Sequence, residues 1–201
     1  MSHRDVYSAA LTREQFLFYE IRAVARLSLE GLDDKAIHDR ILVENLFQFP
    51  TERSVRDMTN TCLRRINLLE NVSLIDLLAN APADVGKQVN LYAMMCDNRI
   101  VWDFMISVVG EKFRIHDLSF GRTDVNMFLF RLQEQNDVAA KWSDGTVSKL
   151  KSVLSRCLLE TGYLSDGKDE VLNPILLYDE MEKGIRANGD LAALSAFNCF
   201  R

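Results

Sequence analysis

The sequence has no long apolar run, which bears on a membrane location. A membrane-spanning helix needs about 18 consecutive apolar residues, and the nearest candidate, the stretch 100–109, is interrupted by Asp103. Residues 1–15, MSHRDVYSAALTREQ, also lack the apolar centre of a secretion signal. We therefore expect a soluble, cytoplasmic protein that has no membrane partner.

Cysteine is scarce and widely spaced. The four cysteines are Cys62, Cys96, Cys157 and Cys199, and no two of them form a Cys-x-x-Cys pair. This spacing argues against a zinc site and against a disulfide framework. We expect reduced thiols, as in other cytosolic proteins.

Residues that commonly carry catalysis are also few. Among the three histidines, His116 with Asp117 forms at most half of a metal or acid–base site, because nothing nearby in the sequence completes it. The chain has no glycine-rich phosphate loop, no Gly-x-Ser-x-Gly and no His-Glu-x-x-His sequence. We expect no metal, no cofactor and no enzymatic activity.

Proline, glycine and net positive charge are limited as well. With three prolines and nine glycines the chain has no linker-like stretch, and its 48% apolar and 26% charged residues are typical of a globular protein. The net charge is −5, so the chain as a whole is not a general polyanion binder. Any contact with nucleic acid must come from a local basic patch.

What the sequence does contain is helical periodicity along most of its length. Thr12 and Gln15 form a capping box, which predicts a helix from there to about Leu29 after a frayed arm at 1–11. The stretch 98–113 is so apolar in its first turns that we expect it to be the central buried helix. The pattern predicts a protein built mainly from helices.

A glycine-containing connector near 115–123 divides these helices into two parts. We expect an all-α protein in which an N-terminal helical bundle, residues 12–115, packs on a C-terminal unit, residues 120–190. The C-terminal unit is expected to be winged-helix-like, with one small β-hairpin.

The helix expected at about 51–69 has two cleanly separated faces. One face carries apolar residues: Val55, Met58, Cys62, Ile66 and Leu69. The opposite face carries a stripe without acids: Arg53, Arg56, Asn60, Arg64 and Asn67. The stripe is either a solvated face whose arginines pair with acids on other helices, or a ridge that contacts phosphates, which arginine binds through two parallel hydrogen bonds.

The stretch 146–177 has the most informative layout. Its helix places one set of residues on an apolar arc: Val147, Leu150, Val153, Leu154, Cys157 and Leu158. The other side carries Ser148, Lys149, Ser152, Ser155 and Arg156. Gly162 ends the helix, and Asp166-Gly167 predicts a hairpin turn before Val171-Leu172. A basic, serine-rich helix followed by a hairpin is the layout of a winged helix-turn-helix, although an ordinary amphipathic helix with a closing hairpin has the same pattern.

The chain resembles the BrxA family, the small helical component of bacteriophage-exclusion (BREX) defence systems. The resemblance covers about residues 14–180 and rests on three groups of positions. These are Asn45-Leu46, Pro50-Thr51, Arg56 and Leu63-Arg64-Arg65-Ile66; Asp103-Phe104, Val108-Val109 and Glu111-Lys112; and Leu150, Leu154 and Leu158 before Gly162-Tyr163-Leu164.

The resemblance implies a cytoplasmic, helical protein with a winged-helix-like part that binds double-stranded DNA and does no chemistry itself. Such a protein acts beside other phage-defence proteins, among them a methyltransferase and an ATPase. The expected DNA contacts go mainly to backbone phosphates, through Arg53, Arg56, Arg64, Ser148, Lys149, Lys151, Ser152, Arg156 and Lys168. The alternative is an assembly adaptor that binds defence-system proteins without touching DNA.

Overall fold

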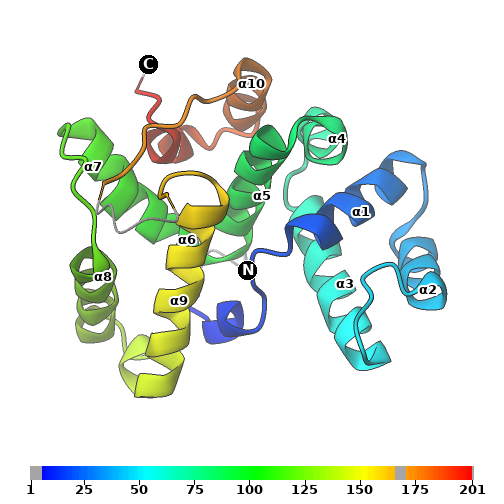
Figure 1. The fold of residues 1–201 in the computed structure, drawn as a ribbon, viewed down its shortest axis with the longest axis horizontal. Coiled ribbons are helices and arrows are strands. Elements are labelled where there is room, and N and C mark those ends of the chain that lie inside the picture. Colours follow the sequence, from blue (N-terminus) through cyan, green and yellow to red (C-terminus); the bar gives the residue numbers. More distant parts are fainter. Residues whose placement is uncertain (1–5, 166–170, 201) are drawn as a thin grey trace.

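The computed structural model describes residues 6–165 and 171–200, and their regular structure is helical (Figure 1). In chain order the elements are η2 (Ala9–Thr12), α1 (Phe18–Leu29), α2 (Asp34–Glu44), α3 (Glu52–Asn67), α4 (Val72–Asn80), α5 (Ala83–Asp97), α6 (Arg99–Phe104), η3 (Met105–Gly110), α7 (Glu111–Arg114), α8 (Arg122–Gln135), η4 (Ala139–Lys141), α9 (Asp144–Glu160), α10 (Asp179–Ala187) and η5 (Leu191–Phe197). No strand is assigned within the described ranges. The predicted all-α class is therefore confirmed.

Helix α5 lies at the centre of this arrangement. Helices α1 to α4 lie to its right in Figure 1 and α7 to α9 to its left, and α5 packs against α1, α3, α4 and α6. Every residue from Gln88 to Asp97 is buried. We had expected the stretch 98–113 to be the central helix, but that stretch keeps Ser107 exposed on its polar side. Because neighbours cover α5 on several sides, it is buried around its whole circumference.

The stretch 98–113 is a continuous helix with an irregular middle. Its six central residues, η3, form a π-helix between α6 and α7. Gly110 ends this segment, and a Cβ atom at that position would lie 2.8 Å from Ser195 Oγ and 3.0 Å from the Ser195 carbonyl carbon. A glycine is therefore required for the C-terminal helix η5 to pack this closely.

The described part of the N-terminal arm, residues 6–11, packs against the molecule, whereas we expected residues 1–11 to fray. Leu11 is 1% exposed, η2 packs against α9, and the Tyr7 hydroxyl donates to Asp103 at 2.5 Å. Helix α1 begins at Phe18, so the prediction of a helix from Thr12 was wrong for its first residues. The arm instead crosses the middle of the molecule, next to α9 and α5 (Figure 1).

The predicted winged helix and its hairpin are not confirmed. The expected turn at Asp166-Gly167, with Lys168, lies outside the described residues. One backbone hydrogen bond joins the segments on either side of it, from the Asn173 N–H to Tyr163 O at 2.8 Å. A second bond connects the later segment to the connector before α8, from the Leu172 N–H to Leu118 O at 2.7 Å. An isolated antiparallel bridge pairs Ser119 with Val171.

The buried apolar residues form one cluster that extends from Leu11 to Phe197. It includes the whole apolar arc predicted for α9. The division of the chain at 115–123 stays a prediction. Within the ranges described, no helix combines the length and the apolar character that crossing a bilayer requires.

Candidate nucleic-acid interface

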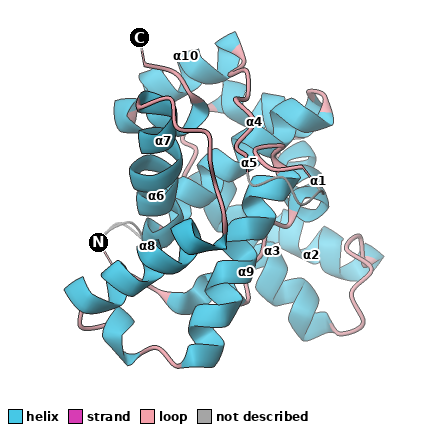
Figure 2. Cartoon of the chain, turned by 60° about the vertical axis from the view of Figure 1, so that its left-hand side comes forward, coloured by secondary structure: helices cyan, strands magenta, loops and turns pink. Residues whose placement is uncertain are grey.

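Several lysines and arginines on α8, η4 and α9 form no ion pair with a described residue. Every lysine and arginine from residue 122 to residue 151 lacks an ion pair with any described residue: Arg122, Arg131, Lys141, Lys149 and Lys151. All are exposed except Lys151, which is half-buried. Helices α8 and α9 pack against each other, and both lie in the lower part of Figure 2. The pair therefore presents cations that form no ion pair with a described residue, next to the exposed acids Glu134, Asp137 and Asp144 of the same stretch.

The outer side of α9 carries four of the predicted contacts in exposed positions. These are Ser148, Lys149, Ser152 and Arg156. Ser143 begins the helix by accepting the Thr146 N–H at 3.2 Å, which fixes the register of this polar side. Arg156 also pairs with Glu160 at 2.5 Å, and its side chain remains 65% exposed.

A groove of about 420 Å³ lies between α8 and α9. Its lining includes Arg122 and Asn126 from α8 and Ser148, Lys151 and Ser152 from α9. Sequence reasoning missed Arg122. The sequence feature that could have identified it is its position directly after Gly121, at the start of α8. Backbone N–H groups at a helix start bind phosphate, and hydroxyl groups on a helix face also contact phosphate.

Arg53 and Arg56 lie exposed at the start of α3. Arg53 approaches Asp57 at 3.9 Å and Arg56 approaches Glu52 at 3.6 Å, both as pairs within one helix. Exposed pairs of this kind contribute about 0.3–0.5 kcal/mol. Both guanidinium groups are therefore free to exchange an acid for a phosphate.

Arg64, at the other end of the predicted stripe, has different surroundings. Its Nε donates to Asp97 at 2.6 Å, one Nη donates to Glu14 at 2.6 Å, and the side chain is 28% exposed. The hydrogen bond to Asp97 raises the pKa of Arg64 above its ordinary value. The neighbouring Arg65, which sequence reasoning passed over, is 1% exposed and pairs with the same carboxylate at 3.4 Å. The internal pairing considered for the stripe thus applies to Arg64.

A larger hollow, which we call the aromatic pocket, adjoins two basic regions. These are the start of α3, with Arg53 and Arg56, and the outer side of α9, with Lys149 and Arg156. The pocket has a volume of about 610 Å³ and is bounded by the arm, the start of α1, the loop before α3, α3 itself and α9. Ser54 and Asp57 line it from α3, and Arg156 and Glu160 line it from α9. The Arg53 end of α3 and the Arg156 end of α9 therefore border the same hollow.

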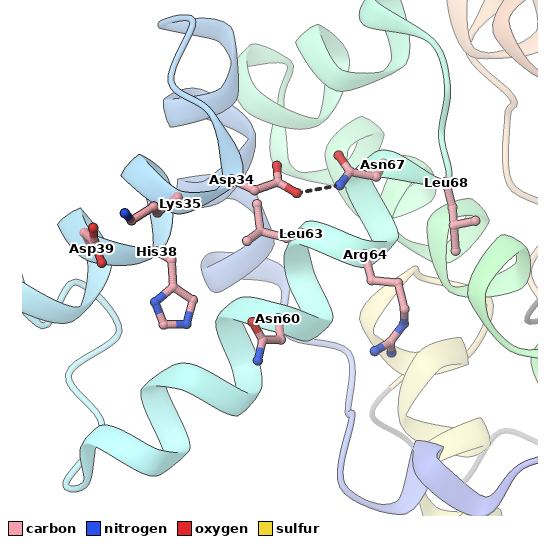
Figure 3. A pocket seen from close by; sticks show the side chains of 9 residues that line it. All are labelled: Asp34, Lys35, His38, Asp39, Asn60, Leu63, Arg64, Asn67 and Leu68. Carbon is pink, nitrogen blue, oxygen red and sulfur yellow. Dashed lines mark hydrogen bonds between the residues drawn. The ribbon is translucent and has the colours of Figure 1, made fainter.

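A second hollow of about 600 Å³ lies between α2 and α3 (Figure 3). It holds His38, with Asp34 and Asp39 on the same helix. Asp34 accepts a hydrogen bond from Asn67 at 3.0 Å, and Arg64 points away from His38 in Figure 3. Among the described residues no hydrogen bond to the His38 ring is formed.

The other reactive side chains are tied to structural roles. Burial raises the pKa of Cys62 and of Cys157 to about 12, so both remain protonated thiols. The four cysteines are free, as expected. Asp117 accepts from Ser119 and pairs with Lys112 at 3.1 Å. No cluster of His, Cys, Asp and Glu suited to a metal ion occurs in the part of the chain that the structure describes.

The family model for BrxA matches residues 5–189 of this chain. The chain belongs to the BrxA family. A relative in Bacillus cereus (strain H3081.97), named "BREX protein BrxA", is 32% identical over 94% of this chain and 95% of its own length. A BrxA relative of the same name in Paramagnetospirillum magneticum (strain AMB-1) is 24% identical over 85% of each chain. The resemblance stated from the sequence is confirmed.

The BrxA fold also has a solved counterpart. The crystal structure of an uncharacterized protein from Magnetospirillum magneticum superposes with a TM-score of 0.80, at 22% identity, over 95% of this chain and 97% of that one. The match extends across both groups of helices, so the arrangement around α5 is the fold of that protein as well. The names of the BrxA relatives state membership of BREX and name no enzymatic activity.

Proposed function

We propose that this BrxA-family protein is a double-stranded-DNA-binding component of a BREX phage-defence system, and that it contacts mainly backbone phosphates. The observation that carries the proposal is the set of exposed or half-buried cations on α8 and α9 that form no ion pair with a described residue, Arg122, Arg131, Lys149 and Lys151. In a chain with net charge −5, a cation without an ion pair has no bound negative charge to stabilise it. A polyanion such as DNA supplies that negative charge.

The arrangement around α9 supports a winged-helix mode of binding. A winged helix-turn-helix has a helix, a short strand, two further helices and then a hairpin. Here Leu118 follows α7, the helices α8 and α9 come next, and segments 163–164 and 171–173 follow α9, with backbone hydrogen bonds from 171–173 back to Leu118 and Tyr163. In this mode α9 lies in the major groove, and its Lys149 and Arg156 contact the flanking phosphates.

The proposed contacts are Arg53, Arg56, Ser148, Lys149, Lys151, Ser152 and Arg156, with Arg122 added from the groove. Lys168 belongs to the predicted wing, outside the described residues, and stays a prediction, as does the cytoplasmic location. Arg64 is a weaker candidate because its guanidinium already bonds Asp97 and Glu14. The proposed role is binding without catalysis.

One observation favours the second candidate, an assembly adaptor within the defence complex. Met127 and Phe130 of α8 are 45% and 56% exposed. They lie beside the grooves that flank this helix. Exposed apolar groups next to each other are typical of protein contacts. An adaptor needs these residues and is indifferent to Lys149 and Lys151.

The decisive experiment is a titration of the protein with a short DNA duplex at several salt concentrations. If about five phosphates are neutralised, log K falls against log salt with a slope of about −4 to −5. The variant Lys149→Ala/Lys151→Ala is expected to reduce the slope by about 2, since each lost phosphate contact removes about 1.

The matched control is Lys35→Ala/Lys183→Ala. Both lysines are exposed and lack an ion pair within the described chain, but they lie on α2 and α10. This variant removes the same net charge and is expected to leave the slope unchanged. Equal effects of the two variants would reduce the binding to a general charge effect, and an absence of binding at low salt would leave the adaptor as the better account.

A further inference from the structure

We propose that the aromatic pocket binds one unpaired nucleobase of the DNA that the basic surface holds. The inference rests on the proposed DNA-binding function and adds a second substrate element, a base outside the double helix. Ser54 and Asp57, next to Arg53 and Arg56 on α3, and Arg156 of α9 line the pocket, so it adjoins both groups of proposed phosphate contacts.

The pocket is lined by aromatic side chains, one of which is open to solvent. Phe16 and Phe18 form its buried wall, each 5% exposed, and Tyr19 stands at the rim with 80% of its surface exposed. The Tyr19 ring packs edge-on against Phe18, with 5.5 Å between the ring centroids. An aromatic ring that is held from below and open to solvent is a stacking platform for a base.

The polar lining matches the remaining parts of a nucleotide. Arg13 is exposed at the rim and has no ion pair with a described residue, and Arg156, which pairs with Glu160, lines the pocket from α9. These cations suit the flanking phosphates. Glu20, Asp57 and Glu160 add carboxylates to the lining, and a carboxylate accepts hydrogen bonds from the exocyclic amino group of a base. In duplex DNA base pairing occupies those amino groups, so the pocket suits an unpaired adenine, cytosine or guanine better than thymine.

The segment that forms the pocket is held in a fixed shape by buried side chains. Arg65 donates to the carbonyl oxygens of Glu14 and Gln15 at 2.7 and 2.8 Å, and Asn90 donates to that of Phe16 at 2.5 Å. The next residue, Leu17, has φ 49°, a left-handed conformation that costs a non-glycine residue energy. The hydrogen bonds to these three consecutive carbonyls hold the strained Leu17 backbone in place before a ligand binds. Sites that bind small flat ligands are commonly preformed in this way.

A single aromatic side chain from a protein fits this lining less well. It would use the ring faces, but it carries neither the amino donors that suit Glu20 and Asp57 nor the negative charge that suits Arg13 and Arg156. A nucleotide carries all three. Its volume also falls well within the 610 Å³ available.

The test compares two duplexes that differ by one unpaired adenine in the middle of one strand. Stacking of one base changes binding by about ten-fold, so we expect the wild-type protein to bind the bulged duplex about ten-fold more tightly than the paired one. Tyr19→Ala is expected to remove this preference and leave binding of the paired duplex unchanged, whereas Tyr19→Phe retains the preference. Tyr178→Ala, at a 46% exposed tyrosine before α10, is the matched control and behaves as wild type.

A duplex with an unpaired thymine separates base recognition from general flexibility of bulged DNA. We expect its preference to be smaller than that of adenine, and 2-aminopurine at the bulge reports stacking on Tyr19 as quenched fluorescence. Equal binding of bulged and paired duplexes by wild type, with the salt dependence intact, overturns the pocket assignment alone. If the wild-type protein binds neither duplex, the DNA-binding function is overturned, and this inference with it. A bulge preference that survives Tyr19→Ala places the unpaired base elsewhere.

Discussion

Asp97 is the buried carboxylate that holds two arginines of α3 in structural roles. Its side chain is 3% exposed and lies between Arg64 and Arg65. A buried carboxylate is tolerated when cations and hydrogen bonds replace the water it has lost. Arg65 in turn holds the arm, so Asp97 supports the wall of the aromatic pocket through this arginine.

We expect Asp97→Asn to lower the free energy of unfolding by about 3–5 kcal/mol, because it leaves a buried arginine without its counter-charge. The measurement is urea unfolding followed by circular dichroism. Asp103→Asn is the control, since that carboxylate is 30% exposed and pairs with Arg99 at 3.3 Å; we expect a loss of about 1 kcal/mol there. Equal losses for the two variants would contradict the buried-network account.

The fate of the arginine stripe could not be deduced from the sequence of α3. Periodicity shows which residues share a face of a helix, but it does not show which element covers that face. The carboxylate that engages Arg64 and Arg65 comes from α5, which is more than 30 residues further along the chain. Arg53 and Arg56 remain exposed because α5 does not reach the start of α3, and that is also a tertiary fact.

At the scale of elements, the predictions that held were those in which local pattern and packing agree. All six residues of the apolar arc predicted for α9 are buried. The start of α1 is the opposite case. Thr12 and Gln15 satisfy a capping box, but the bonds that Arg65 and Asn90 make to residues 14–16 hold the arm out of a helix. The aromatic pocket exists because of this departure, so no local signal predicted it.

The packing of η3 against η5 gives a prediction at the same scale. Gly110→Ala places a methyl group 3.0 Å from backbone of Ser195, and overpacking of this kind costs about 1–3 kcal/mol. Gly145→Ala is the matched control. Its nearest neighbour would be 3.9 Å away, and alanine in the first turn of α9 is expected to add about 0.4–1 kcal/mol. Thermal unfolding distinguishes the opposite signs, and a stabilised Gly110→Ala protein would refute the close contact.

The whole molecule is acidic, and its positive charge is therefore most available where cations form no ion pair. With a net charge of −5, most cations outside α8 and α9 pair with a carboxylate, as Lys87 does with Glu160 at 2.9 Å and Arg114 does with Glu111. Salt screens charges beyond about 10 Å at 0.1 M, so a bound duplex responds to the nearest side chains. The distribution of paired and unpaired cations thus matters more than the total charge.

The last prediction asks whether one duplex reaches both basic regions. On a duplex of roughly 20 base pairs, about 68 Å long, Arg53→Ala/Arg56→Ala is expected to reduce the salt slope by about 2, and combining it with Lys149→Ala/Lys151→Ala by about 4. On a duplex of roughly 8 base pairs, which is about 27 Å long, the combined variant is expected to lose less, because fewer phosphates lie within reach at once. The measurement is the same salt titration on both lengths. If Arg53→Ala/Arg56→Ala leaves the slope of the long duplex unchanged, the DNA contacts α8 and α9 alone, and the start of α3 faces another partner.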